Sequence, residues 1–62
     1  MAKTRTEVIE LIQERISELK GLIKDAIEKI ETGKEEPWTR KNLGEYKEVL
    51  EINERMLKQI MK

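Results

Sequence analysis

The residue types that most often perform covalent or acid–base chemistry are almost absent from this sequence. Its 62 residues include no histidine and no cysteine, a single serine (Ser17) and a single aspartate (Asp25). A serine nucleophile needs a neighbouring base, and no histidine is present to activate Ser17. No Gly-rich phosphate loop or metal-ligand spacing occurs, and the Glu-x-x-His pattern of di-iron bundles needs the missing histidine. We therefore expect no catalytic residue, no metal site, no cofactor and no enzyme activity.

Two polar residues occupy positions that would lie in the water-excluded interior of a helical bundle. On ideal helical wheels, Arg15 falls at the centre of one apolar arc and Asn53 near the centre of another. A buried cation must be paired, because an unpaired one is strongly destabilising. The favoured interpretation is that both residues hydrogen-bond within the bundle, to each other or across a dimer, and fix its register. The alternative is a ligand or partner site.

The only tryptophan lies close to basic residues. Trp38 is followed by Arg40 and Lys41, and an aromatic ring beside cations can stack on a nucleic-acid base and contact a phosphate. Two glutamates lie among these basic side chains, however. The sequence favours a structural role, in which Trp38 packs on Leu43 and sets the angle of the following helix. Contact of Trp38, Arg40 and Lys41 with a protein is the second interpretation, and contact with nucleic acid is the third.

The elements that must position these residues are two amphipathic helices. The first is expected at residues 5–31, opened by a capping box of Thr4 and Glu7, with Thr6 as the alternative cap. It should end where Gly33 can take the left-handed conformation. Its apolar residues span an arc of roughly 160°, which is wider than one neighbouring helix covers. The first helix therefore needs more cover than the second can give.

The second helix is expected at residues 40–62, after a connector at 32–39 in which Pro37 disfavours helix. Thr39 is its expected N-cap. Its apolar arc spans about 140°, and Ile52 lies outside that arc. So short a connector joins antiparallel neighbours, and antiparallel pairing brings opposite charges together. The charged residues concerned are Glu7, Glu10, Glu14 and Glu18 on the first helix and Arg55, Lys58 and Lys62 on the second.

The antiparallel register places the large Tyr46 across from the small Ala26. Nothing in the sequence explains Gly21 and Gly44, which lie on polar faces and should each cost about 1 kcal/mol relative to alanine. The residues expected to form the core of the hairpin and the interface of its oligomer are Val8, Leu11, Ile12, Arg15, Leu19, Leu22, Ala26, Tyr46, Leu50, Asn53, Leu57 and Ile60.

Length and composition favour self-association. A single domain of residues 1–62 has a core that only marginally offsets the entropy lost on folding, and it lacks disulfides and the best metal ligands. Basic and acidic residues balance at 13 each, so long-range attraction to nucleic acid or to an anionic membrane is not expected. No signal peptide or membrane span is recognisable. We expect an all-α, cytoplasmic protein whose antiparallel hairpins dimerise into a four-helix bundle.

In size and layout the chain resembles the small plasmid-encoded RNA-binding regulators that dimerise two helical hairpins into a four-helix bundle. It shares no residue motif with them, and a fold does not carry a function with it. We interpret the chain as a homo-oligomeric module that binds another protein or assembles a complex, and its composition suits a bacterial or phage accessory protein. The alternative is a nucleic-acid-binding regulator, which a continuous basic stripe would favour and interspersed charges would disfavour.

Overall fold

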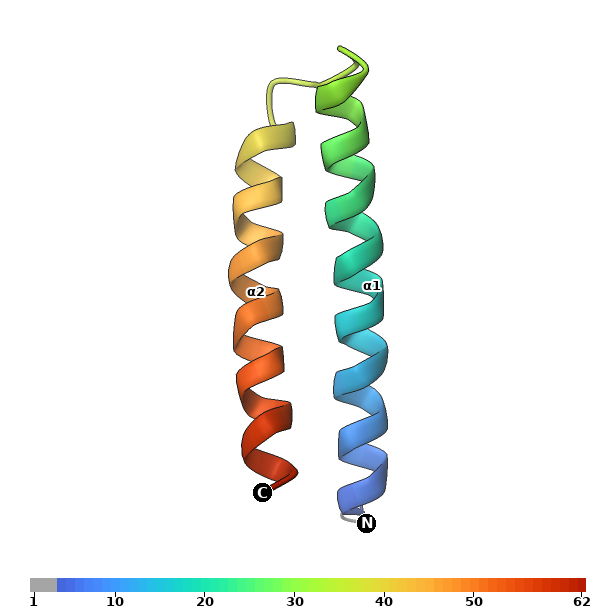
Figure 1. The fold of residues 1–62 in the computed structure, drawn as a ribbon, viewed down its shortest axis with the longest axis vertical. Coiled ribbons are helices and arrows are strands. Elements are labelled where there is room, and N and C mark those ends of the chain that lie inside the picture. The colour runs from blue at the N-terminus through green and yellow to red at the C-terminus, as the bar shows by residue number, and fades with distance from the viewer. Residues whose placement is uncertain (1–3) are drawn as a thin grey trace.

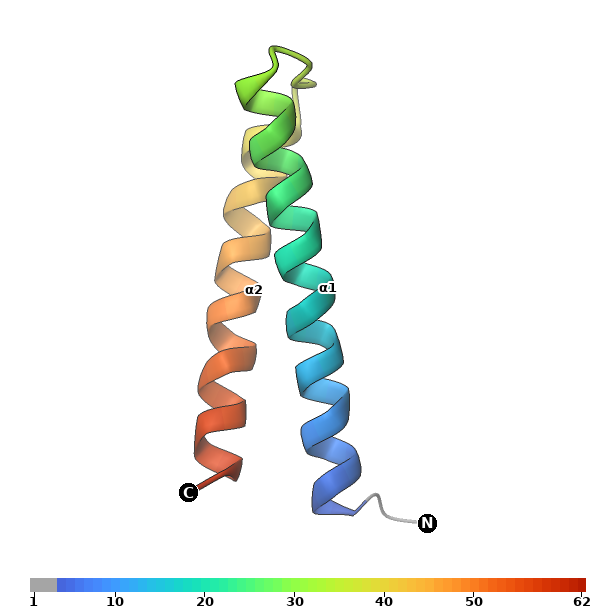
Figure 2. The same cartoon turned by 45° about the vertical axis from the view of Figure 1, so that its right-hand side comes forward.

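The computed structural model describes residues 4–62, and within this range the chain forms two α-helices and no strand. Helix α1 spans Arg5–Glu31 and helix α2 spans Thr39–Ile60. The helices run side by side in opposite directions, with the connector at one end and both chain ends at the other (Figure 1). Figure 2 shows that their axes are slightly inclined, so that they separate toward the chain ends. The prediction of an antiparallel helical hairpin is confirmed.

Helix α1 begins where the sequence predicts. Thr4 is extended, with φ −71° and ψ 161°, and its hydroxyl accepts a hydrogen bond from the backbone N–H of Glu7 at 3.2 Å. Within the described residues the Glu7 side chain makes no return bond, so only half of the expected capping box forms. The guanidinium of Arg5 donates to the carbonyl of Ile60 and so links the two helices near the chain ends.

Helix α1 ends on a glycine that has left-handed backbone angles. Gly33 has φ +72°, and its N–H donates to the carbonyl of Ile30 at 3.3 Å. The N–H of Lys34 donates to the carbonyl of Lys29 at 2.8 Å. These two bonds define a Schellman motif, which satisfies carbonyls at the end of the helix and requires a residue that tolerates positive φ. Gly33 therefore ends the helix as predicted.

Helix α2 begins one residue earlier than expected, and the prediction that Thr39 is its N-cap is wrong. The cap is Trp38, whose side chain makes no capping hydrogen bond. Trp38 has φ −95° and ψ −6°, the angles of the third residue of a type I turn. The Thr39 N–H closes this turn on the carbonyl of Glu36 at 3.1 Å. Since Pro37 favours the second position of such a turn, the turn shifts the helix start.

The hydrophobic core is a thin seam between the helices. The buried apolar residues all come from α1, and they are Ile12, Ile16, Leu19 and Ala26. The two buried residues of α2, Thr39 and Asn53, are both polar. The hairpin measures 45 × 17 × 16 Å with a radius of gyration of 14.4 Å, whereas a compact domain of this length would have about 10.6 Å. The hairpin is therefore a rod with little interior.

The expected charge contacts between the helices are not formed. Among residues 4–62, the ion pairs are Lys29–Glu36, Arg40–Glu35 and Arg55–Glu51, and none joins α1 to α2. The antiparallel sense therefore rests on the short connector and the apolar seam, and the ion pairs contribute nothing to it. In the described part of the chain, no helix is long and apolar enough to cross a membrane.

Candidate interaction surface

The most prominent surface feature is a set of large apolar side chains that the hairpin leaves uncovered. Five of them expose between 41% and 55% of their surface. They come from the middle of both helices, and we call this surface the open face. Its apolar residues are Leu11 and Leu22 of α1 and Val49, Ile52 and Met56 of α2.

Helix geometry and a shared pocket place these residues on one side of the hairpin. Leu22 lines a shallow pocket together with Asn42 and Tyr46 of α2. Val49 follows Tyr46 by three residues and therefore lies on the same side of α2. Leu11 precedes Leu22 by eleven residues, or about three turns, and therefore lies on the same stripe of α1. The open face thus runs over both helices.

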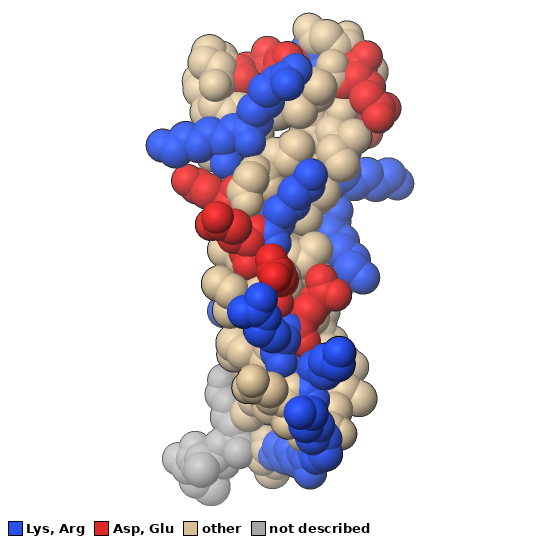
Figure 3. All heavy atoms as spheres, turned by 60° about the vertical axis from the view of Figure 1, so that its left-hand side comes forward, with Lys and Arg blue, Asp and Glu red and all other residues tan. Residues whose placement is uncertain are grey.

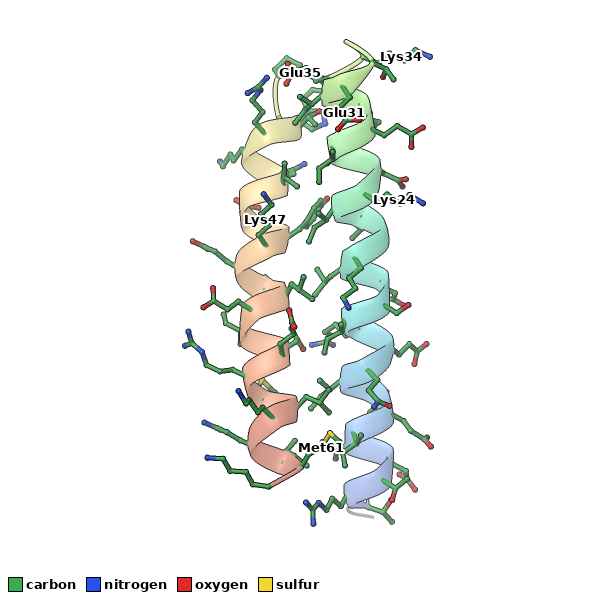
Figure 4. The ribbon with its side chains drawn as sticks, in the orientation of Figure 1. Lys24, Glu31, Lys34, Glu35, Lys47 and Met61 are labelled. Atoms are coloured by element: carbon green, nitrogen blue, oxygen red, sulfur yellow. The ribbon has the colours of Figure 1, made fainter. Side chains whose placement is uncertain are left out.

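The opposite side of the hairpin is better covered. It carries a second shallow pocket, lined by Ile23 and Ile27 of α1 and Leu50 of α2. Its exposed large apolar residues are Ile27, at 37%, and Met61, which lies at the far end of α2 (Figure 4). These two residues lie near opposite ends of the rod, whereas the apolar residues of the open face form a group. The hairpin therefore has one dominant apolar face.

The twelve residues expected in the core or interface divide into three groups. Buried in the hairpin are Ile12, Leu19, Ala26 and Asn53; half-buried are Val8, Tyr46, Leu50, Leu57 and Ile60; exposed are Leu11, Arg15 and Leu22. Ala26 and Tyr46 line the same pocket, in keeping with the expected register.

Arg15 is exposed in the single hairpin, outside its core, and its expected place in an oligomer interface stays a prediction. The apolar arc of α1 is wider than the strip that α2 covers, and Arg15 falls in the uncovered part together with Leu11 and Leu22. Among residues 4–62, neither Arg15 nor the neighbouring Glu18 has an ion-pair partner. Within residues 4–62, the open face of α1 therefore carries a cation and an anion that have no ion-pair partner, and both lie between two leucines.

Asn53 lies in the core, as its position on the wheel predicts. It is 5% exposed, and its side-chain amide donates to the carbonyl of Val49, one turn earlier, at 2.7 Å. This bond satisfies the amide within its own helix, because the carbonyl lies four residues back. The expected pairing of Asn53 with Arg15 is absent from the described hairpin, since the two side chains lie in different environments.

The connector forms a separate candidate region. Trp38 is 55% exposed and lines the pocket that also holds Tyr46 and Asn42. Because Trp38 is itself the helix cap, it does not precede the cap as a staple with Leu43 requires. The predicted position of Trp38 before the cap is therefore wrong, and its exposed ring is available for contact with a partner.

The two basic residues after Trp38 differ in their surroundings. Arg40 donates from Nε and Nη2 to the Glu35 carboxylate at 2.8 and 3.1 Å. This hydrogen bond, with the attraction of the guanidinium, lowers the pKa of Glu35, and the same bond raises the pKa of Arg40. Lys41 is exposed, and no ion pair is formed by it within residues 4–62. Arg40 is therefore already engaged by a carboxylate, which reduces what it offers to a phosphate.

Charges of both signs are distributed along the molecule. On the face shown in Figure 3, acidic and basic side chains alternate over the upper part, and basic ones gather at the lower end. A continuous basic stripe along this face, as nucleic-acid binding would favour, is not seen. In the described residues, no group of three or more histidine, cysteine, aspartate or glutamate side chains could hold a metal ion.

Sequence reasoning missed most of the α2 part of the open face. Ile52 falls outside the apolar arc that faces α1, and its significance becomes clear only when Val49 and Met56 are found exposed beside it. A signal was present, because these residues recur at spacings of three and four, the pattern of a helical contact stripe. Glu18 was expected beside the basic residues of α2 and was not recognised as part of this face.

Comparison of the chain with protein-family models, with curated proteins and with solved structures found no match. The fold and the surface thus define a class, a helical hairpin with one uncovered apolar face.

Proposed function

We propose that this protein is a homo-oligomeric assembly module, in which a second copy of the chain covers the open face and two hairpins form a four-helix bundle. The observation that carries the proposal is the uncovered apolar surface itself. Monomeric proteins rarely leave large side chains of this kind grouped on one face, and such groups mark interaction sites.

The exposed area of the hairpin supports a second copy of the chain as its partner. The hairpin exposes 5237 Å², whereas a compact monomer of 7.4 kDa would expose about 4,200 Å². The excess is close to the roughly 800 Å² that each partner contributes to a standard protein–protein interface. One further hairpin, packed against the open face, would bury most of this excess.

The biological task we infer is to hold two copies together and to bind or assemble another protein in the cytoplasm, as a small accessory protein. The interspersed charges and the engagement of Arg40 by Glu35 favour a protein partner over nucleic acid. The exposed Trp38 at the connector is the contact residue we favour for that further partner, because exposed aromatic residues are enriched at binding sites.

The test is sedimentation equilibrium across dilutions from millimolar to micromolar concentration. We expect dimers that dissociate on dilution, with Ile52→Glu shifting the equilibrium to monomers. Met61→Glu is the matched control, because it places the same charge on an exposed apolar position outside the open face. A parent chain that is a folded monomer throughout the series would refute the proposal.

A further inference from the structure

We infer that the two copies pack with their connectors at opposite ends, so that α1 lies on the partner's α1 and reciprocal ion pairs join Arg15 of each chain to Glu18 of the other. This inference rests on the proposed dimer and specifies its geometry. It begins from four residues of α1 and three of α2 on the open face.

The α1 part of the open face has a palindromic character. Leu11, Arg15, Glu18 and Leu22 follow one another at spacings of four, three and four, which places them within roughly 60° on the helix. Read in either direction, the order begins and ends with leucine and has opposite charges in the middle. Its midpoint lies between residues 16 and 17.

The α2 part of the open face is also centred on its own midpoint. Val49, Ile52 and Met56 occupy a stripe of roughly 60°, and its midpoint lies between residues 52 and 53. The two midpoints lie at about the same height of the hairpin. Arg5 contacts Ile60 at one end, and Lys24 lies about level with Lys47 nearer the connector (Figure 4). Interpolation between these pairs places residues 16–17 opposite residues 52–53.

Two hairpins can stack face to face with two-fold symmetry in two ways. With both connectors at the same end, α1 of each chain faces the partner's α2. Arg15 and Glu18 then lie against the apolar stripe of Val49, Ile52 and Met56, which offers neither charge an ion-pair partner from the other chain. Since an unpaired charge removed from water is strongly destabilising, this arrangement is disfavoured.

With the connectors at opposite ends, each helix faces its own copy about the common midpoint. Leu11 then meets the partner's Leu22, and Arg15 meets the partner's Glu18. Two-fold symmetry repeats both contacts, because each interface residue contacts its counterpart reciprocally. On α2, Val49 meets the partner's Met56 across a centre at Ile52. Apolar residues thus meet apolar ones, and both charges that lack an ion-pair partner in the described chain gain one.

The experiment exchanges these charges. The Arg15→Glu chain carries two acidic residues at these positions of the open face, and the Glu18→Arg chain carries two basic ones. Each variant alone should dimerise at least about tenfold more weakly than the parent, because like charges then face each other. An equimolar mixture should form heterodimers with near-parental affinity, measured by native mass spectrometry and sedimentation. The double variant Arg15→Glu/Glu18→Arg should recover homodimers.

The matched control mixes Lys24→Glu with Glu10→Arg, which make the same charge changes on exposed positions of α1 outside the open face. This mixture should show no preference for heterodimers. If the mixture of the Arg15→Glu and Glu18→Arg chains behaves like the control while the parent dimerises, the inferred geometry is overturned. The proposed dimer itself is then retained. A monomeric parent would instead refute the proposed function.

A distance measurement separates the two arrangements without altering the interface. The chain has no cysteine, so Lys34→Cys in the connector provides one spin-label site per chain. With connectors at opposite ends the two labels should lie about 50 Å apart, from the helical rise of 1.5 Å per residue. With both connectors at the same end, the labels would lie within about 25 Å, the width of two packed helices. A separation in that range would overturn the inferred geometry.

Discussion

The hydroxyl oxygen of Thr39 accepts a hydrogen bond from the backbone N–H of Glu36 at 2.9 Å, while the Thr39 N–H donates to the Glu36 carbonyl. Thr39 is only 5% exposed. The two bonds close the turn around Pro37 from both sides, and they fix the point at which the chain reverses. The expected capping role of Thr39 is thus replaced by a bond that points backward along the chain.

Loss of this hydroxyl should destabilise the hairpin. Thr39→Val keeps the shape of the side chain but leaves the Glu36 amide without its partner, at a cost of about 1 kcal/mol. Urea unfolding at a fixed chain concentration measures the effect, since the midpoint of an oligomer depends on concentration. Thr39→Ser, which retains the hydroxyl, should lie closer to the parent than Thr39→Val. The reverse order would show that the hydroxyl is unimportant.

Replacement of the two unexplained helical glycines should stabilise the protein. A Cβ atom added at Gly21 or Gly44 would meet no atom within 4 Å, so each change to alanine should add about 0.5 to 1 kcal/mol by raising helix propensity. Thermal unfolding followed by circular dichroism measures the gain. Gly33→Ala is the contrasting variant, because its φ of +72° should make alanine destabilising by about 1 kcal/mol.

If Gly21→Ala or Gly44→Ala instead weakens dimerisation, the glycine lies in a contact with another chain. That contact would lie outside the open face, since both glycines are exposed on the polar sides of their helices.

Removal of the buried side-chain amide of Asn53 should stabilise the protein and make its oligomeric state less uniform. Asn53→Leu replaces a polar group that is 5% exposed with an apolar one, and we expect the free energy of unfolding to rise by about 1 kcal/mol or more, measured as a higher urea midpoint. A polar residue at a core position favours one register over others, so the variant should show several oligomeric species by sedimentation velocity. One sharp species identical to the parent would argue against a register role.

The Arg40–Glu35 pair should respond to pH in a defined direction. Since the pKa of Glu35 is lowered in the folded chain, its stabilising contribution is present above the unfolded-state pKa of about 4.3, and it is lost as pH falls through the folded-state pKa. Arg40→Ala should return the Glu35 pKa toward its ordinary value. Carboxyl-carbon NMR titration measures this shift directly.

The control for that titration is Lys41→Ala, which removes a neighbouring charge that makes no ion pair among residues 4–62. A Glu35 pKa that responds equally to both substitutions would show that general surface charge, not the hydrogen bond with Arg40, sets its value.

The local elements of this fold were predictable because local interactions determine them. The 3.6-residue period of apolar side chains, the hydroxyl of Thr4 and the left-handed Gly33 identify α1 with bounds that match the structure. The start of α2 was displaced by one residue, because a proline turn and a buried threonine compete with the expected cap. Such turns depend on how the connector packs, which a helical wheel does not contain.

By itself, the sequence determined that two amphipathic helices form and that the first has more apolar surface than a second helix can cover. Tertiary structure decided which part of that surface stays uncovered. Once α2 lies against Ile12, Ile16 and Leu19, the side of α1 that carries Leu11, Arg15 and Leu22 faces solvent. The physical reason is that one helix covers only part of a wide apolar arc, so the packing direction of α2 chooses between core and open face.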